Sequence, residues 1–261
     1  MKRIIAFVII ITTLLSVTAC ALFAGEDTVK FDKKDSLVIA HRGLSGLETE
    51  NTDRAFIAAG KRSYYGIEAD VRKTADGYFV ICHDDNLERI SGKDINVESS
   101  TLAELMEIPL IDKQGRGGVY LTDLAGYISI CKKYDKQAIL ELKSSFSEEE
   151  IASIIEIIRS FDYLERVIFI SFGYDNLLHV RKFSPNQTVQ YLFSEVTDDV
   201  VEKLTRDKID VGIKYTAINR ESLEKFHSAD LKVNCWTVDS KLIAEQLADM
   251  GVDYITTNIL E

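Results

Sequence analysis

Short apolar runs alternate with amphipathic segments along most of the chain, and this alternation predicts a fold built from repeated strand–helix units. The clearest helical segment is 148–161, where apolar positions recur at helical spacing after Ser147, a side chain suited to a helix N-cap. Segments 219–229 and 241–250 look similar. The apolar runs, each typical of a buried strand, are centred near Leu37, Ile67, Ile139, Ile168, Val189, Val211, Val233 and Tyr254. Eight such strands predict a parallel sheet closed into an α/β fold, the (β/α)8 TIM barrel, with helices outside.

Three acidic residues lie on the predicted strands at positions that bring their side chains together. The period of two in a strand places Glu68 and Asp70 on the same face of the second strand, and Glu141 lies on the third. Burying carboxylates side by side is costly unless a bound cation offsets their repulsion. Hard oxygen ligands suit Mg²⁺ or Ca²⁺, so we expect one divalent cation at this site.

Histidines and fixed positive charges also lie at the strand ends. The chain has four histidines, and two of them, His41 and His83, follow apolar strands. The ordinary pKa of histidine suits proton transfer near neutral pH. Arg42 and Lys143 add positive charges, and a guanidinium matches the geometry of a phosphate. A divalent metal, two imidazoles and two cationic side chains together indicate cleavage of a phosphodiester.

These residues belong to motifs that follow one another in a defined order. The motifs are His41-Arg42-Gly43, Glu50-Asn51-Thr52, Glu68-Ala69-Asp70, the Asp76-Gly77 turn and His83-Asp84. Their order and spacing resemble the bacterial glycerophosphodiester phosphodiesterase family, and the resemblance continues through 141–143, 171–172, 233–238 and 251–257. It implies a single metal-dependent TIM-barrel domain over residues 36–261. Segment 77–136 is longer than a strand–helix connection requires and contains a further strand at 78–83, which the resemblance places in a hairpin at the barrel mouth.

The resemblance also implies a role for each site residue. By similarity these are catalytic His41 and His83, metal ligands Glu68, Asp70 and Glu141, phosphate-binding Arg42 and Lys143, and Trp236 lining the pocket for the alcohol portion. Glu50 is a supporting residue, which hydrogen-bonds a catalytic histidine, contacts the metal or caps the helix that starts near Thr52. Two positions depart from the family pattern, Thr49 in place of a proline and Asn258 in place of an aspartate.

The expected reaction is hydrolysis of a glycerophosphodiester to sn-glycerol 3-phosphate and an alcohol by the two histidines. Two alternatives stay open from the sequence. One is a lysophospholipase D or another phospholipase that acts on lipids. The other is a surface protein that binds glycerophosphodiesters without cleaving them.

Composition limits the possible partners of the protein. The chain has 261 residues, 46% hydrophobic content and a formal net charge of −11, which suits one sizeable core. No run of basic residues offers the electrostatic footprint that a nucleic acid requires, so we expect no nucleic-acid partner.

The N-terminus carries the pattern of a secretory signal. Lys2 and Arg3 precede an uncharged, mostly apolar segment, 4–17, that is too short for a comfortable membrane span. It ends in Val17-Thr18-Ala19-Cys20, which resembles a bacterial lipobox. We expect residues 1–19 to be a signal peptide, Cys20 to be lipidated, and residues 20–35 to tether the domain to the membrane. The alternatives are an ordinary cleaved signal, which would give a secreted protein, and an uncleaved anchor, and all of these place the domain outside the cytoplasm.

Overall fold

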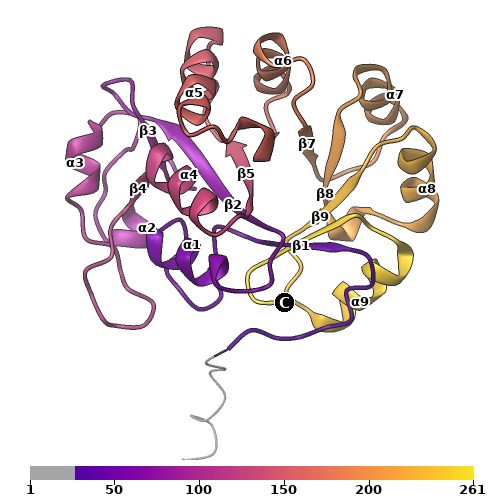
Figure 1. Cartoon of the computed structure of the whole chain (residues 1–261), viewed down its shortest axis with the longest axis horizontal. Coiled ribbons are helices and arrows are strands. Elements are labelled where there is room, and N and C mark those ends of the chain that lie inside the picture. Colours follow the sequence, from indigo (N-terminus) through magenta and orange to yellow (C-terminus); the bar gives the residue numbers. More distant parts are fainter. Residues whose placement is uncertain (1–26) are drawn as a thin grey trace, which may run out of the picture.

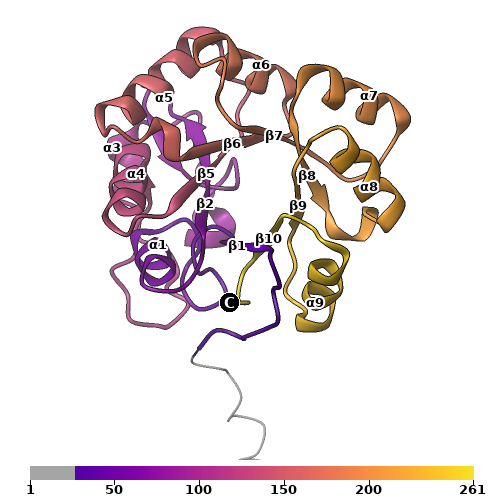
Figure 2. The ribbon, with the colours of Figure 1, turned by 45° about the vertical axis from the view of Figure 1, so that its right-hand side comes forward.

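A computed structural model describes residues 27–261, and the expected signal peptide and Cys20 lie outside the described residues. Eight parallel strands pair into a closed barrel, in which β1 contacts both β10 and β2 (Figures 1 and 2). They are β1 (Leu37–Ala40), β2 (Gly66–Lys73), β5 (Gln137–Leu142), β6 (Val167–Ser171), β7 (Val189–Phe193), β8 (Asp210–Lys214), β9 (Val233–Trp236) and β10 (Tyr254–Thr257). The predicted (β/α)8 barrel is confirmed.

Helices lie between consecutive barrel strands and form an outer ring (Figure 2). These are α1 (Asp53–Gly60), α4 (Leu124–Lys133), α5 (Glu148–Ser160), α6 (Tyr174–Phe183), α7 (Asp198–Asp207), α8 (Arg220–Ser228) and α9 (Lys241–Met250), with short 3₁₀ turns at Leu164–Arg166 and Tyr215–Ala217. Ser147 and Glu150 form a capping box at the start of α5, which explains why the predicted segment begins there. No helix in the described part of the chain has the length and hydropathy of a membrane span.

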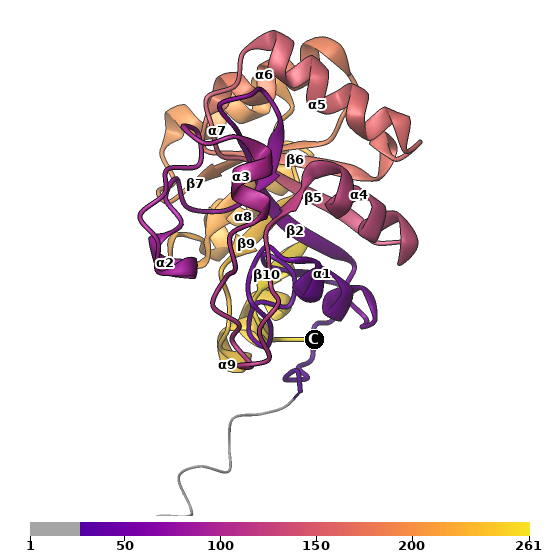
Figure 3. The same ribbon diagram turned by 90° about the vertical axis from the view of Figure 1, so that its left-hand side faces the viewer.

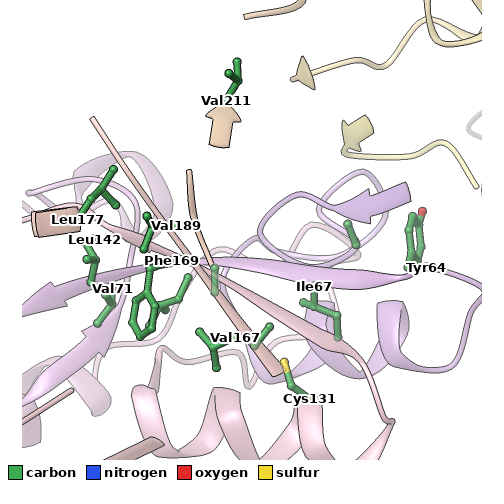
Figure 4. Close-up of a cluster of buried hydrophobic side chains, with 14 of the residues drawn as sticks. Tyr64, Ile67, Val71, Cys131, Leu142, Val167, Phe169, Leu177, Val189 and Val211 are labelled. Carbon is green, nitrogen blue, oxygen red and sulfur yellow. The ribbon is translucent and has the colours of Figure 1, made fainter. Parts of the chain in front are cut away.

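The strand period of two divides the apolar residues into two layers. Ile67, Ala69 and Val71 of β2 point outward and pack between the sheet and the helices, in a cluster that Figure 4 shows in part. A smaller cluster fills the inside of the barrel and consists of Ile39, Ile139, Ile168, Ile170, Leu192 and Tyr254. Both faces of the sheet are therefore buried, as expected for parallel strands. The free thiols of Cys131 and Cys235 are buried in the outer layer, and the buried Cys82 thiol belongs to a separate apolar cluster.

An insertion between β2 and α4 stands at one end of the barrel, and Figure 3 views the molecule from its side. It contains β3 (Phe79–Ile81), α2 (Glu88–Ser91), α3 (Leu102–Met106) and β4 (Thr122–Asp123). β3 runs antiparallel to the last part of β2, with Ile81 opposite Val71. The insertion has a small apolar core of its own, which includes Leu87 and Leu105. The expected hairpin therefore lies at the carboxyl ends of the strands, which form the mouth of the barrel.

Residues 27–31 and 258–261 lie together beside α1 and form what we call the seam. The backbone N–H of Val29 donates to the carbonyl of Ile259, and the N–H of Glu261 donates to the carbonyl of Val29. Phe31 packs against the main core. Much of the described part of the expected tether is thus attached to the barrel.

Candidate active site

The mouth of the barrel surrounds a cavity of about 200 Å³. Seven of the predicted site residues line this cavity, namely His41, Arg42, Glu68, His83, Glu141, Lys143 and Trp236. Asp70 is fully buried next to Glu68 and Glu141, and Glu50 borders a neighbouring hollow that also contains His41 and Arg42. These residues are far apart in the sequence and meet because parallel barrel strands all end at the same mouth.

Glu68, Asp70 and Glu141 form a compact cluster of buried carboxylates. One oxygen of each lies within 4.8 Å of the others, and the residues are 2%, 0% and 8% exposed. Burial and the charges of the two neighbouring carboxylates raise the pKa of Glu68. Burial and Asp70 raise the pKa of Glu141 to about 7. The carboxylates are close enough to make ionisation unfavourable in the absence of a cation.

Asp70 differs from its two neighbours because positive side chains face it. Burial opposes its ionisation, but Arg42 and Lys143 outweigh burial and lower its pKa. The Asp70 Oδ2 atom accepts a hydrogen bond of 2.7 Å from Asn51, whereas its buried Oδ1 atom has no hydrogen-bond partner within residues 27–261. An unpartnered anionic oxygen among three carboxylates fits the donor set of a hard divalent cation.

Arg42 takes its place through an unusual backbone turn. Arg42 and Gly43 have φ angles of 53° and 73°, and a Cβ atom on Gly43 would lie 2.6 Å from the carbonyl carbon of Ala55. Only glycine fits this close approach between the loop and α1. The turn lets the Arg42 N–H donate to the Glu68 carboxylate at 2.7 Å.

Two side-chain cations neutralise part of the charge at the mouth. The Arg42 guanidinium donates to Glu50 at 2.8 Å and lies 3.4 Å from Asp70. Lys143 Nζ lies 3.0 Å from a Glu141 oxygen. Both side chains are 14–18% exposed and border the cavity, so both are accessible to an anionic ligand.

The two histidines have different partners. His41 Nδ1 lies 2.8 Å from the side-chain oxygen of Asn258, and burial, followed by Arg42, lowers its pKa to about 4. His83 Nδ1 lies 2.7 Å from the Asp84 carboxylate. Burial also lowers the pKa of His83, although the negative charge of Asp70 opposes this shift. A histidine beside a carboxylate and one beside an amide differ in how strongly their imidazolium forms are stabilised.

Glu50 connects the His83 side of the site to Arg42 through Arg89. Arg89 donates to Asp84 at 2.6 Å and to both Glu50 oxygens at 2.7 and 2.9 Å. In the described part of the chain, Glu50 makes no hydrogen bond to a histidine, and the cap of α1 is Thr52. Glu50 therefore supports the site through two arginines, an arrangement that none of the sequence alternatives contained.

Several residues at the site were not singled out from the sequence. Asn51 orients Asp70, and its φ of 55° is one that asparagine tolerates better than most residues. Phe172 packs edge-on against Trp236 with ring centroids 5.5 Å apart, and both line the cavity. Asn51 and Phe172 both lie in segments that carry the family resemblance, and this was the sequence signal that could have identified them.

Residues 41–261 match the model of the glycerophosphoryl diester phosphodiesterase family. The chain belongs to this family. This phosphodiesterase is 30% identical over 231 residues to a glycerophosphodiester phosphodiesterase of Caldanaerobacter subterraneus, an alignment that covers 85% of this chain and 94% of the relative. It is 27% identical to a glycerophosphodiester phosphodiesterase of Bacillus subtilis, with 98% and 95% covered.

Solved structures of glycerophosphodiester phosphodiesterases and a related phosphodiesterase have the same fold. An Oleispira antarctica phosphodiesterase in complex with the product sn-glycerol-3-phosphate superposes with a TM-score of 0.80 at 28% identity, covering 85% of this chain and 92% of that chain. A glycerophosphodiester phosphodiesterase from Parabacteroides distasonis gives a TM-score of 0.73 at 28% identity, with 87% and 94% covered. The protein is thus an enzyme of glycerophosphodiester hydrolysis, and its acidic cluster could hold a metal ion.

Proposed function

We propose that the protein hydrolyses glycerophosphodiesters to sn-glycerol 3-phosphate and an alcohol, using one divalent cation and acid/base catalysis by His41 and His83. The observation that carries the proposal is the cavity at the mouth, which both histidines line together with Arg42, Lys143 and two of the three clustered carboxylates. The related Oleispira antarctica structure with sn-glycerol-3-phosphate supports this product.

Glu68, Asp70 and Glu141 would hold the cation, which is Mg²⁺ or Ca²⁺ because the donors are carboxylate oxygens. When bound, such an ion polarises a phosphoryl oxygen as a Lewis acid. Arg42 and Lys143 bind the phosphate and stabilise the charge that develops in the transition state. One histidine removes a proton from the nucleophile, and the other protonates the leaving oxygen.

The apolar part of the cavity favours a substrate whose glycerol carries no acyl chain. Trp236 and Phe172 form one wall, and Ile170 and Leu192 lie in the same lining. The cavity volume of about 200 Å³ suits a glycerol moiety better than an acyl chain. We therefore propose glycerophosphodiesters, rather than intact lysophospholipids, as the preferred substrates.

The proposal is tested by the release of glycerol 3-phosphate from glycerophosphocholine by the full chain. We expect EDTA to abolish release and Mg²⁺ or Ca²⁺ to restore it. His41→Ala and His83→Ala should each lower kcat on the order of a hundredfold or more. His179→Ala, a substitution on the outer helix α6, is the matched control and should keep full activity.

Three results would contradict this proposal. Full activity in the His83→Ala protein would remove His83 from the reaction. Faster turnover of lysophosphatidylcholine than of glycerophosphocholine would indicate a phospholipase, and binding without turnover under either cation would indicate a binding protein.

We also propose that the domain lies outside the cytoplasm, anchored through Cys20. The first described residue, Asp27, pairs with Arg62, which lies between α1 and the start of β2. The chain therefore enters the domain near the end of the barrel opposite the mouth, so an anchor there would leave the mouth open to soluble substrates. Incorporation of radiolabelled palmitate into the protein, lost in Cys20→Ser, would support the anchor, and equal labelling of both proteins would contradict it.

A further inference from the structure

Asn258 and Asp239 form a chain of hydrogen bonds that ends on His41. The Asn258 side-chain oxygen lies 2.8 Å from His41 Nδ1. On its other side, the Asn258 Nδ2 group donates to Asp239 at 2.6 Å. The backbone N–H of Asn258 donates to the second Asp239 oxygen at 2.8 Å. Asp239 lies in the connection between β9 and α9, so the chain of bonds joins three separate segments.

Asp239 and the Ser45 hydroxyl, which donates to the Asn258 side-chain oxygen at 2.7 Å, together determine which way the Asn258 amide points. The oxygen and nitrogen of an amide have nearly the same shape, and only the hydrogen-bond network distinguishes them. An ionised carboxylate can only accept hydrogen bonds, so the amide atom facing Asp239 must be the NH₂ group. The Asn258 oxygen is therefore the atom that faces His41.

This orientation in turn determines the tautomer of His41. A carbonyl oxygen has no proton to donate, so the 2.8 Å contact is a hydrogen bond only if His41 Nδ1 carries the proton. In the neutral ring, Nε2 then has a free lone pair. The ring borders the cavity at the mouth, where such a lone pair can accept a proton.

We propose that Asn258 and Asp239 are positioning residues that hold His41 as the Nδ1–H tautomer, so that Nε2 is the proton acceptor of the reaction. The inference rests on the proposed function of His41. Asn258 orients the ring without placing a negative charge against it, whereas Asp84 places a carboxylate against His83. Asn258 thus fixes the tautomer of His41 while leaving the ring neutral and ready to accept a proton.

The variant Asp239→Asn tests the orientation with almost no change in shape. The new side-chain oxygen would keep the bond from the Asn258 backbone N–H, which leaves its NH₂ group facing the Asn258 side chain. Two NH₂ groups cannot bond to each other, so the Asn258 amide should turn over and donate to His41 Nδ1. The His41 ring would then have to carry its proton on Nε2.

The double variant Asp239→Asn/Asn258→Asp should restore the original tautomer. A carboxylate at position 258 accepts from the His41 Nδ1–H and from the NH₂ group at position 239. The matched control is Asp253→Asn, because Asp253 makes a similar contact with His227 at 2.9 Å, and this pair is not part of the cavity lining.

The tautomer is read by ¹⁵N NMR of the full chain labelled at histidine, with a His41→Gln sample to assign the His41 signals. We expect Nδ1–H in the unmodified protein, Nε2–H in Asp239→Asn and Nδ1–H again in the double variant. An Nε2–H tautomer in the unmodified protein, or an unchanged tautomer in Asp239→Asn, would overturn the inference.

Kinetics with glycerophosphocholine give the second readout. We expect kcat to fall about tenfold or more in Asp239→Asn with little change in KM, and to stay unchanged in Asp253→Asn. A changed tautomer with an unchanged kcat in Asp239→Asn would overturn the catalytic part of the inference. If no variant and no unmodified protein cleaves the substrate, the proposed function fails while the NMR result still decides the tautomer.

Discussion

Carboxylates are buried both at the mouth and at the seam, and the two regions satisfy them in opposite ways. At the seam, the Glu261 side chain is 6% exposed and accepts hydrogen bonds from Ser63 and Thr28, with Lys30 at 3.0 Å. At the mouth, Asp70 Oδ1 has no hydrogen-bond partner among the described residues, and Glu68 and Glu141 repel it.

The pKa values follow this difference. Burial on its own would raise the pKa of Glu261, but the hydrogen bonds from Ser63 and Thr28 lower it to about 2. The pKa of Glu68 is instead raised by burial and by its acidic neighbours. The ionised Glu261 carboxylate at the seam therefore stabilises the folded state. At the mouth, ionisation of the clustered carboxylates is unfavourable unless a cation binds them.

The largest expected effect is loss of activity in Glu68→Gln. The amide keeps an acceptor for the Arg42 N–H but removes a charged metal ligand, which should lower kcat/KM on the order of a hundredfold or more. Its free energy of unfolding in EDTA should not fall, because the substitution removes one of the carboxylates that repel one another. Denaturant titration and glycerol 3-phosphate release measure the two quantities, and full activity would place the metal elsewhere.

Metal binding at the carboxylate cluster of the mouth should stabilise the folded protein, and the seam should not contribute to this effect. A cation at a hundred times its dissociation constant adds about 2.7 kcal/mol to the free energy of unfolding. Thermal unfolding with and without Mg²⁺ or Ca²⁺ should show this increase in the unmodified protein and in Glu261→Gln. Glu68→Gln should lose most of it, and equal stabilisation of Glu68→Gln would argue against the cluster as the site.

Glu261→Gln should lower stability without affecting the reaction. The substitution leaves partly unsatisfied the buried groups that now bond to the carboxylate, at a cost of about 1–3 kcal/mol. The free energy of unfolding should fall accordingly in urea titrations. Values of kcat and KM should match the unmodified protein, and a change in either would show that the seam is coupled to the mouth.

The smallest expected effect is the change with pH in the difference in unfolding free energy between the unmodified protein and Glu261→Gln. Because the pKa of Glu261 is lowered by folding, its contribution is complete at neutral pH and is lost as pH falls through the ordinary range of a glutamate toward about 2. The gap in unfolding free energy between the unmodified protein and Glu261→Gln should therefore shrink on acidification. A gap that stays constant across this range would show that the charge of Glu261 does not contribute.

Much of the fold and many of the residues that line the mouth follow from the sequence. The apolar run centred near Ile139 predicts β5, which spans Gln137–Leu142, and segment 148–161 predicts α5 closely. The run centred near Val233 predicts β9, which ends at Trp236. The alternation that places Glu68 and Asp70 on one face depends only on neighbouring positions. The sequence therefore predicts that both side chains point to the inside of the barrel.

Contacts between distant segments could not be predicted in this way. The link from His83 to Glu50 passes through Arg89, and the link from His41 to Asp239 passes through Asn258, which is 217 residues away from His41. Residues 27–31 have no periodicity that suggests a strand, yet Val29 pairs with the end of the chain.

The sequence by itself determined the strands, the helices and the residue types at the mouth, because periodicity and capping are properties of neighbouring positions. Only the tertiary structure decided which partner each charged or polar side chain received. Closing the barrel brings β1 against β10 and places the insertion over the end of β2. The partners of His41, His83 and Glu261 are therefore set by three-dimensional proximity, since hydrogen bonds and ion pairs depend on distances that sequence separation does not fix.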